Sequence, residues 1–160
     1  MTISEVKEVL RIKMSNPQHS TEFLIGFPGV GKSDIVRQVK GELGYDHLID
    51  LRLSQHDATD IKGIPETKNG QLQWIPPQFM PIEGSEWEGT SGVLFFDEIN
   101  RAQTEVLQAV FEAVYDRRIG MRKILDSWHI IAAGNYGYED STDVVEMDSA
   151  LKNRFQFIEV

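Results

Sequence analysis

Cysteine is absent from the sequence, and so is any long apolar run. Without cysteine, the chain cannot build a disulfide scaffold, a thiol nucleophile or a cysteine zinc site. No apolar stretch approaches the roughly 18 residues that a membrane-spanning helix needs. Residues 1–8 also lack the apolar core of a signal peptide. We therefore expect a soluble, cytoplasmic protein that does not bind membranes.

Basic residues are scarce relative to acidic ones. The chain of 160 residues has 16 lysines and arginines against 25 aspartates and glutamates, which gives a formal net charge of −9. This balance argues against a broad, non-specific nucleic-acid surface, which needs a net basic face, but it leaves room for a local basic patch. The length fits about one domain, and a domain of this size buries enough surface for a substantial core.

Residues 26–33, Gly-Phe-Pro-Gly-Val-Gly-Lys-Ser, fit the phosphate-loop pattern G-x-x-x-x-G-K-S/T. The apolar run 21–25 before this loop is typical of a strand, and residues 34–40 after it have the apolar spacing of a helix. This strand–loop–helix context is the one that the pattern requires. The sequence therefore predicts a site for the phosphates of a nucleoside triphosphate.

The residue types in the phosphate loop suit this ligand. Gly26, Gly29 and Gly31 lack a Cβ atom, so the backbone can turn tightly and approach a phosphate closely. Backbone N–H groups and the N-terminal end of the following helix favour an anion at the same place. Lys32 would contact the β- and γ-phosphates, and the Ser33 hydroxyl would bind Mg²⁺. The predicted nucleotide-binding residues are Gly26, Phe27, Pro28, Gly29, Val30, Gly31, Lys32, Ser33 and Asp34.

A second functional segment lies at residues 93–98. Four apolar residues precede Asp97 and Glu98, and a short, fully apolar run is typical of a central parallel strand that is buried on both faces. Both carboxylates would then lie at the C-terminal end of the strand, where open α/β sheets bind their ligands. We predict that Asp97 binds Mg²⁺ and that Glu98 is the general base that orients the attacking water.

Two later segments have candidate roles. A strand predicted at 128–133 is followed by Gly134 and Asn135, and the Asn135 amide would donate to the γ-phosphate and help to hold the water. Residues 117–123 contain four cations and are predicted to form a hairpin. In one interpretation these cations line a pore or touch a partner subunit. In the other they belong to a solvated turn, and the sequence leaves both open.

The remaining residues alternate between helical and strand patterns around one irregular segment. Residues 54–92 are rich in proline, glycine and polar residues, and so long an insertion in a compact domain is usually functional. Within it, Asn69-Gly70 is typical of a two-residue hairpin turn. Helices are predicted at 2–14 (with a Thr2–Glu5 capping box), 33–43, 57–63, 103–115 and 148–154, and strands at 48–53 and 155–160.

Together these motifs give the chain a family resemblance. It resembles an AAA+ ATPase, and within that class it is similar to the MoxR branch. The segments that carry the resemblance are GFPGVGKS at 26–33, FFDEINRA at 95–102, AAGN at 132–135 and SALKNRF at 149–155. The run DEINRA is the most specific to that branch, and the resemblance covers residues 3–160.

The resemblance implies a role for each motif. Lys32 and Ser33 match the Walker A motif, and Asp97 and Glu98 match Walker B. Asn135 matches the sensor 1 position. Arg154 matches the arginine finger, which acts on the nucleotide of a neighbouring subunit, so that Lys32, Glu98, Asn135 and Arg154 would be the catalytic residues.

The resemblance also implies an architecture. The fold would be the α/β three-layer sandwich of P-loop NTPases, with a parallel five-stranded sheet in the order 5-1-4-3-2. Residues 63–74 match the helix-2 insert and residues 117–125 the pre-sensor 1 hairpin, and both would face the pore of a ring. AAA+ modules continue into a helical lid with a sensor 2 arginine, whereas the sequence stops at Val160. We expect one core domain over 1–160 without that lid.

The expected function is Mg²⁺-dependent ATP hydrolysis by a ring-forming homo-oligomer, a hexamer, that remodels a protein partner. MoxR-type proteins suggest a partner with a von Willebrand A domain. A nucleic-acid motor or loader is the alternative that the basic hairpin and Trp74, as a stacking platform, would favour, but the net charge of −9 favours a protein partner. A nucleotide-binding switch with little turnover is the third alternative.

Overall fold

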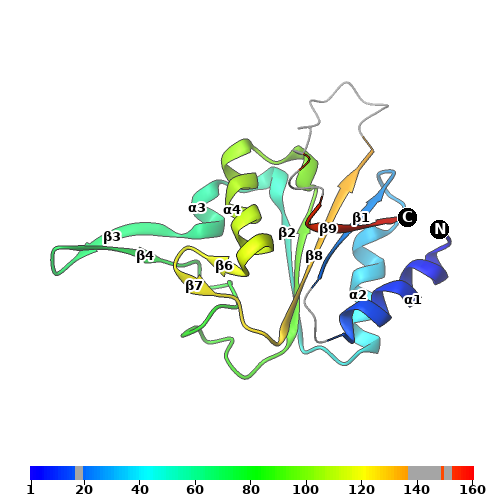
Figure 1. Ribbon diagram of the computed structural model, residues 1–160, viewed down its shortest axis with the longest axis horizontal. Helices are drawn as coiled ribbons and strands as arrows, with labels where there is room; N and C mark the ends of the chain where they lie inside the picture. The colour runs from blue at the N-terminus through cyan, green and yellow to red at the C-terminus, as the bar shows by residue number, and fades with distance from the viewer. Residues whose placement is uncertain (17–19, 137–148, 150–152) are drawn as a thin grey trace.

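A computed structural model describes residues 1–16, 20–136, 149 and 153–160. Its centre is a parallel five-stranded sheet with the strand order β2-β5-β8-β1-β9 (Figure 1). Numbered by their order in the chain, these strands run 2-3-4-1-5, which is the predicted order 5-1-4-3-2 read from the other edge. The five strands are β1 (Thr21–Gly26), β2 (His47–Arg52), β5 (Gly92–Asp97), β8 (Trp128–Asn135) and β9 (Phe155–Glu159).

Helices cover both faces of the sheet and complete the three predicted layers (Figure 1). Helices α1 (Ile3–Met14) and α2 (Lys32–Glu42) pack on one face. Helices α3 (Ala58–Lys62) and α4 (Thr104–Asp116) pack on the other. Each face has its own apolar core, and adjacent residues of β5 serve different cores, with Phe95 in one and Phe96 in the other.

Local sequence chemistry explains where these elements begin and end. The Thr2–Glu5 capping box predicted for α1 is present, since the side chain of each residue bonds the backbone N–H of the other. Strand β5 is buried along its whole length, as expected of a central strand. The second predicted strand is one residue off: β2 ends at Arg52, and Leu53 begins the 3-10 helix η1 (Leu53–Gln55).

The segment between β2 and β5 contains a hairpin that projects far from the body of the domain (Figure 1). Its strands are β3 (Ile64–Lys68) and β4 (Gln71–Ile75), which pair antiparallel. The turn residues Asn69 and Gly70 both have positive φ, which confirms the predicted Asn-Gly turn. The insert at this position is therefore an ordered hairpin rather than an irregular loop.

A second, shorter hairpin is formed by β6 (Arg118–Ile119) and β7 (Arg122–Lys123), as predicted. Its four cations are not equivalent. Arg117 donates from one terminal nitrogen to the carbonyls of Leu125 at 2.9 Å and Trp128 at 2.8 Å, and burial lowers the pKa of its guanidinium. The Arg117 cation therefore supports the hairpin from within and is not part of its exposed basic surface.

The helix predicted at 148–154 lies largely outside the described residues. Among the described residues, none of the helices is both long and apolar enough to cross a membrane.

Candidate nucleotide-binding site

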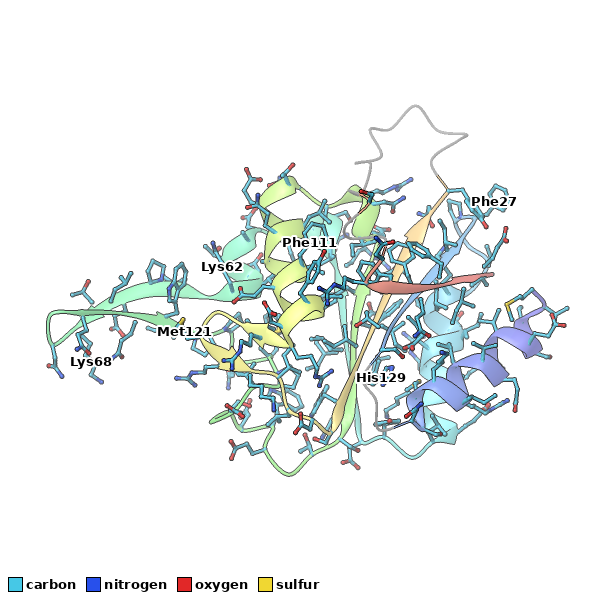
Figure 2. The ribbon with its side chains drawn as sticks, in the orientation of Figure 1. Phe27, Lys62, Lys68, Phe111, Met121 and His129 are labelled. Atoms are coloured by element: carbon cyan, nitrogen blue, oxygen red, sulfur yellow. The ribbon has the colours of Figure 1, made fainter. Side chains whose placement is uncertain are left out.

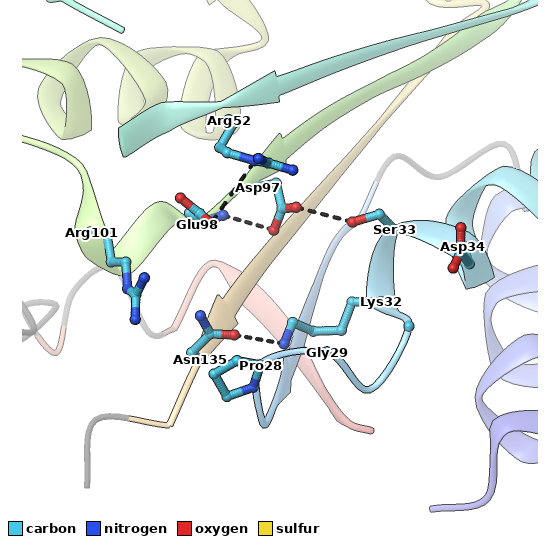
Figure 3. Close-up of a pocket in the computed structure, with 11 residues that line it drawn as sticks. Pro28, Gly29, Lys32, Ser33, Asp34, Arg52, Asp97, Glu98, Arg101 and Asn135 are labelled. Carbon is cyan, nitrogen blue, oxygen red and sulfur yellow. Dashed lines mark hydrogen bonds and ion pairs between the residues drawn. The ribbon is translucent and has the colours of Figure 1, made fainter. Parts of the chain in front are cut away.

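Three parallel strands bring the predicted motifs to one edge of the sheet. Strand β1 leads into the phosphate loop, β5 ends at Asp97, and β8 ends at Asn135. The side chains meet around a cleft of about 320 Å³ (Figure 3). The residues that line this cleft are Pro28, Gly29, Gly31, Lys32, Ser33, Asp34, Arg52, Asp97, Glu98, Arg101 and Asn135.

The three glycines of the phosphate loop suit their positions for different structural reasons. Gly29 and Gly31 have φ of +80° and +95°, a left-handed backbone that favours glycine, and a Cβ on either would meet no atom within 4 Å. Their Cα atoms therefore border open space, as an anion cradle needs. Gly26 instead ends β1, where a Cβ would lie 2.7 Å from the carbonyl oxygen of Val160. Gly26, Phe27 and Val30 belong to the predicted set but do not line the cleft.

Lys32 links the phosphate loop to strand β8. Its Nζ donates to the carbonyls of Gly26 at 3.1 Å and Phe27 at 3.0 Å, and to Oδ1 of Asn135 at 2.7 Å. The residue is only 7% exposed. Burial lowers the pKa of the ammonium, while the nearby Asp97 and Glu98 carboxylates oppose that shift. The cation is thus held between the phosphate loop and β8.

Ser33 and Asp97 form the candidate metal site. The Ser33 hydroxyl donates to Oδ2 of Asp97 at 3.0 Å, which places two oxygen ligands side by side. Hard oxygen donors of this type suit Mg²⁺, which takes its other positions from water and phosphate. Asp50 on β2 is close enough to feel this site, because burial first and then the charge of Asp97 raise its pKa. The donor set therefore fits the predicted ion.

Glu98 follows Asp97 in a left-handed conformation, with φ of 55°. For a residue with a Cβ this conformation costs on the order of 1–2 kcal/mol. The backbone N–H of Glu98 donates to Oδ1 of Asp97 at 2.8 Å, which stabilises the turn. The Glu98 carboxylate accepts a hydrogen bond from the Ser54 hydroxyl and lies 3.9 Å from Nε of Arg52. The end of β2 and the helix η1 therefore hold this carboxylate in place.

Asn100 positions Asn135. The Asn100 amide donates to the carbonyl of Asn135 at 2.6 Å and accepts from its backbone N–H at 3.2 Å. Asn100 belongs to the 3-10 helix η2 (Ile99–Arg101) and is 5% exposed. A Cβ at Gly134 would lie 3.2 Å from Oδ1 of Asn100, so a glycine there lets the two segments approach. The side chain of Asn135 is then free to bond Lys32.

Sequence reasoning missed four residues of this site. Arg52, Ser54 and Asn100 make the contacts just described, and Arg101 lines the cleft. Arg52 could be placed there only from the register of two strands, because it lies opposite Asp97 in the β2–β5 pair. Asn100 and Arg101 were visible only as marks of a family resemblance.

Arg154, the predicted arginine finger, is not part of the cleft. Its guanidinium carbon lies 4.6 Å from the centroid of the Tyr115 ring on α4. It precedes β9, whose opposite end reaches Glu159 beside Ile25 of β1. Arg154 therefore lies at the N-terminal ends of the strands, whereas the phosphate loop lies at their C-terminal ends.

A family model described as an AAA domain, dynein-related subfamily, matches residues 22–155. A curated relative, an ATP-dependent protease ATP-binding subunit-like protein from Rhodococcus erythropolis, is 31% identical over 100 residues. That match covers 57% of this chain and 27% of the relative.

Solved structures share the fold. A candidate ATPase from Cytophaga hutchinsonii superposes with a TM-score of 0.63 at 17% identity, covering 98% of this chain and 45% of that one. Hsp104 in its closed state with ATPγS and FITC casein gives a TM-score of 0.61 at 22% identity, covering 98% of this chain and 31% of that one. At these identities the similarity shows the fold alone, and the chain spans less than half the length of each protein.

Proposed function

Because the chain belongs to the AAA domain family, dynein-related subfamily, we propose that it binds and hydrolyses ATP with Mg²⁺ in the cleft between β1, β5 and β8. The observation that carries this proposal is the convergence of Lys32, Asp97, Glu98 and Asn135, from three strands, on one cleft. A solvated glycine turn with a surface lysine would not need Lys32 buried and bonded across to β8.

In this proposal, each residue of the cleft has its own role in hydrolysis. The phosphate loop and Lys32 hold the β- and γ-phosphates, and Ser33 and Asp97 hold the metal. Mg²⁺, when bound, neutralises charge on the phosphate oxygens. Glu98 takes a proton from the water that attacks the γ-phosphorus, and the bond to the β–γ bridging oxygen breaks, which leaves ADP and inorganic phosphate.

Asn135 serves as the sensor of the γ-phosphate in this proposal. Its Oδ1 accepts from Lys32, so its amide nitrogen is left to donate to phosphate or water. Asn100 fixes its backbone from a buried position. Glu98 and Asn135 are therefore supported by different neighbours, with Ser54 behind the base and Asn100 behind the sensor.

The site would be completed by a neighbouring subunit in a homo-oligomeric ring, as the MoxR resemblance implies for a hexamer. The position of Arg154 supports this. The five residues of β9 separate Arg154 from the C-terminal ends of the strands, where the phosphate loop lies. At the usual rise of a strand this is a span of about 17 Å. An arginine so placed cannot reach the nucleotide of its own subunit but is available to another.

A protein partner fits the surface better than nucleic acid does. Apolar side chains are exposed on both hairpins, with Leu72 66% and Met121 81% exposed, and the net charge is −9. The features that favoured nucleic acid are weaker than the sequence indicated, because the half-buried Arg117 is bonded to backbone carbonyls and Lys62 lies 5.3 Å from the centroid of the Trp74 ring. We also propose that this chain, as a single domain over 1–160, is cytoplasmic and that it remodels a protein partner with a von Willebrand A domain, as in MoxR systems.

The test is Glu98→Gln. This variant should bind ATP like the wild type and lose turnover by about 10²–10⁴-fold, since the amide cannot accept the proton. Phosphate release and equilibrium binding of a fluorescent ATP analogue, measured in the presence of Mg²⁺, separate the two effects. Wild-type turnover in the variant would remove Glu98 as the base. Tight ATP binding without turnover in the wild type would favour the nucleotide switch instead.

A further inference from the structure

Arg101 enters the cleft from the wall opposite the phosphate loop. It is the last residue of η2, directly after the turn that carries Glu98. Figure 3 shows its side chain directed into the cleft, on the far side of Glu98 from Ser33. The phosphate loop and Arg101 therefore face each other across the space that the terminal phosphates would fill.

The backbone of Arg101 is fixed by the same contacts that build the site. Its N–H donates to the carbonyl of Glu98 at 2.9 Å, and the two residues before it, Ile99 and Asn100, are buried. Both the nitrogen and the oxygen of the Asn100 amide are hydrogen-bonded to the backbone of Asn135. The base, the sensor and Arg101 are thus carried by one anchored turn.

The side chain of Arg101 differs from the other cations of the cleft in its contacts. Within the described part of the chain, its side chain makes no hydrogen bond or ion pair, whereas Lys32 has three acceptors and Arg52 lies 3.9 Å from Glu98. An unpaired cation directed into a cleft is available to an anionic ligand. Guanidinium groups bind phosphate in two-point geometry and stay charged at all accessible pH values.

The charge of the lining residues points to the same ligand. The cations Lys32, Arg52 and Arg101 face the anions Asp34, Asp97 and Glu98. Five of these six groups already have partners: Lys32 with Asn135, Asp97 with Ser33, Arg52 with Glu98, and Asp34 with Arg37. Arg101 is the cation left to meet the charge that a triphosphate adds.

We propose that Arg101 contacts the γ-phosphate of the ATP bound in its own subunit and so makes the site select ATP over ADP. This rests on the proposed function, and it adds a cation from the same chain to the one expected in trans from Arg154. The contact is made in the ground state, before the neighbour's arginine acts. Binding by a single subunit should therefore already depend on Arg101.

The experiment measures binding of a non-hydrolysable ATP analogue and of ADP, each with Mg²⁺, at protein concentrations where the particle has the mass of one chain. Arg101→Ala should weaken binding of the ATP analogue about tenfold or more, the effect of losing one charge-assisted hydrogen bond to phosphate. The affinity for ADP should stay within about twofold of the wild type, since ADP lacks the γ-phosphate. Arg101→Lys should recover part of the loss, because lysine restores the positive charge but not the two-point hydrogen bonding of a guanidinium group.

Arg11→Ala is the matched control. Arg11 lies on α1, where it pairs with Glu8 and Glu42, so this variant removes an arginine and one unit of charge away from the cleft. Its affinities should equal those of the wild type. A thermal unfolding curve checks that each variant is folded, and Arg101→Gln provides a second neutral variant of similar size.

The outcomes are distinct. Equal loss of both nucleotides, or no loss of either, would overturn the contact. A loss seen only at concentrations where subunits assemble would move Arg101 to the neighbour's nucleotide and overturn its assignment to its own. Failure of the wild type to bind the ATP analogue would instead remove the proposed function itself.

Discussion

Strands β1 and β8 are tied together at both ends, and the two ties differ in kind. At the C-terminal ends, Lys32 donates to Asn135 at 2.7 Å beside an open cleft. At the N-terminal ends, Glu22 and His129 meet at 2.6 Å, with side chains 0% and 3% exposed. Ser20 donates to the other oxygen of Glu22. The first contact borders the cleft, and we call this the open end; the second joins two buried side chains, and we call it the closed end.

This difference shows what each polar contact can do. His129, labelled in Figure 2, and its partner Glu22 are both buried in the domain, where a polar group without a partner is costly. It therefore stabilises the pairing of β1 with β8. The contact of Lys32 with Asn135 borders solvent and can be exchanged for phosphate, so it can serve chemistry. We expect substitutions at the open end to change turnover and those at the closed end to change stability.

Arg154 is the strongest test of the division between the open and the closed end, because it lies on the side of the closed end but is expected to act in catalysis. Arg154→Ala should lower ATP turnover by about 10³–10⁵-fold, the usual contribution of an arginine finger. Its free energy of unfolding should change little, since the side chain is exposed and its contact with the Tyr115 ring is worth about 0.5–1 kcal/mol. Steady-state phosphate release and a urea unfolding curve measure the two quantities.

Mixing provides the control for the Arg154 variant. Lys32→Ala should be inactive in its own site but still offer Arg154 to a neighbour. A mixture of the two variants should therefore recover part of the activity that each lacks alone. If the mixture stays inactive under conditions where the subunits assemble, Arg154 does not act across an interface.

The sequence predicted elements well wherever one short segment holds the whole signal. The capping box of α1, the Asn69-Gly70 turn and the buried run of β5 are examples, because each depends on neighbours in the chain. The strand order was implied by the resemblance and is confirmed by the structure. Lys32, Ser33, Asp97, Glu98 and Asn135 also meet in one cleft, as their positions at strand ends predicted.

The sequence could not predict contacts between distant segments. Ser54 and Glu98 are 44 residues apart, and Glu22 and His129 are 107 apart, so only the pairing of strands brings them together. Periodicity shows which face of a strand is apolar but not which residue lies opposite on the next strand. The same limit hid the role of Arg117, which looked like part of an exposed cationic hairpin and instead donates to the carbonyls of Leu125 and Trp128.

Glu22→Ala tests the closed end directly. It should lower the free energy of unfolding by about 3–5 kcal/mol, because it leaves His129 unpaired and opens a cavity. Glu22→Gln keeps the shape and one hydrogen bond, so its loss should be clearly smaller. Urea unfolding gives both values, and the turnover of the folded fraction should match that of the wild type. A loss of turnover without a loss of stability would contradict the division between the two ends.

Asp50 gives the smallest expected effect and concerns the open end. Burial first, and then the charge of Asp97, raise its pKa in the folded state. A carboxyl with a raised folded pKa favours the fold below its unfolded pKa, and this contribution is lost as the pH rises through the folded pKa. At neutral pH the ionised Asp50 therefore destabilises the fold, and Asp50→Asn should raise the free energy of unfolding there.

The gain from Asp50→Asn should be less than about 1 kcal/mol, since the side chain is 35% exposed and solvent screens its charge, and since Arg37 lies 4.0 Å away. Urea unfolding at neutral pH and below about pH 3, where the carboxyl is protonated in both states, measures the difference. The variant should be more stable than the wild type only at neutral pH. A loss of stability at neutral pH would mean that the attraction to Arg37 outweighs burial and the repulsion from Asp97. The open end would then resemble the closed one in being stabilised by its charges.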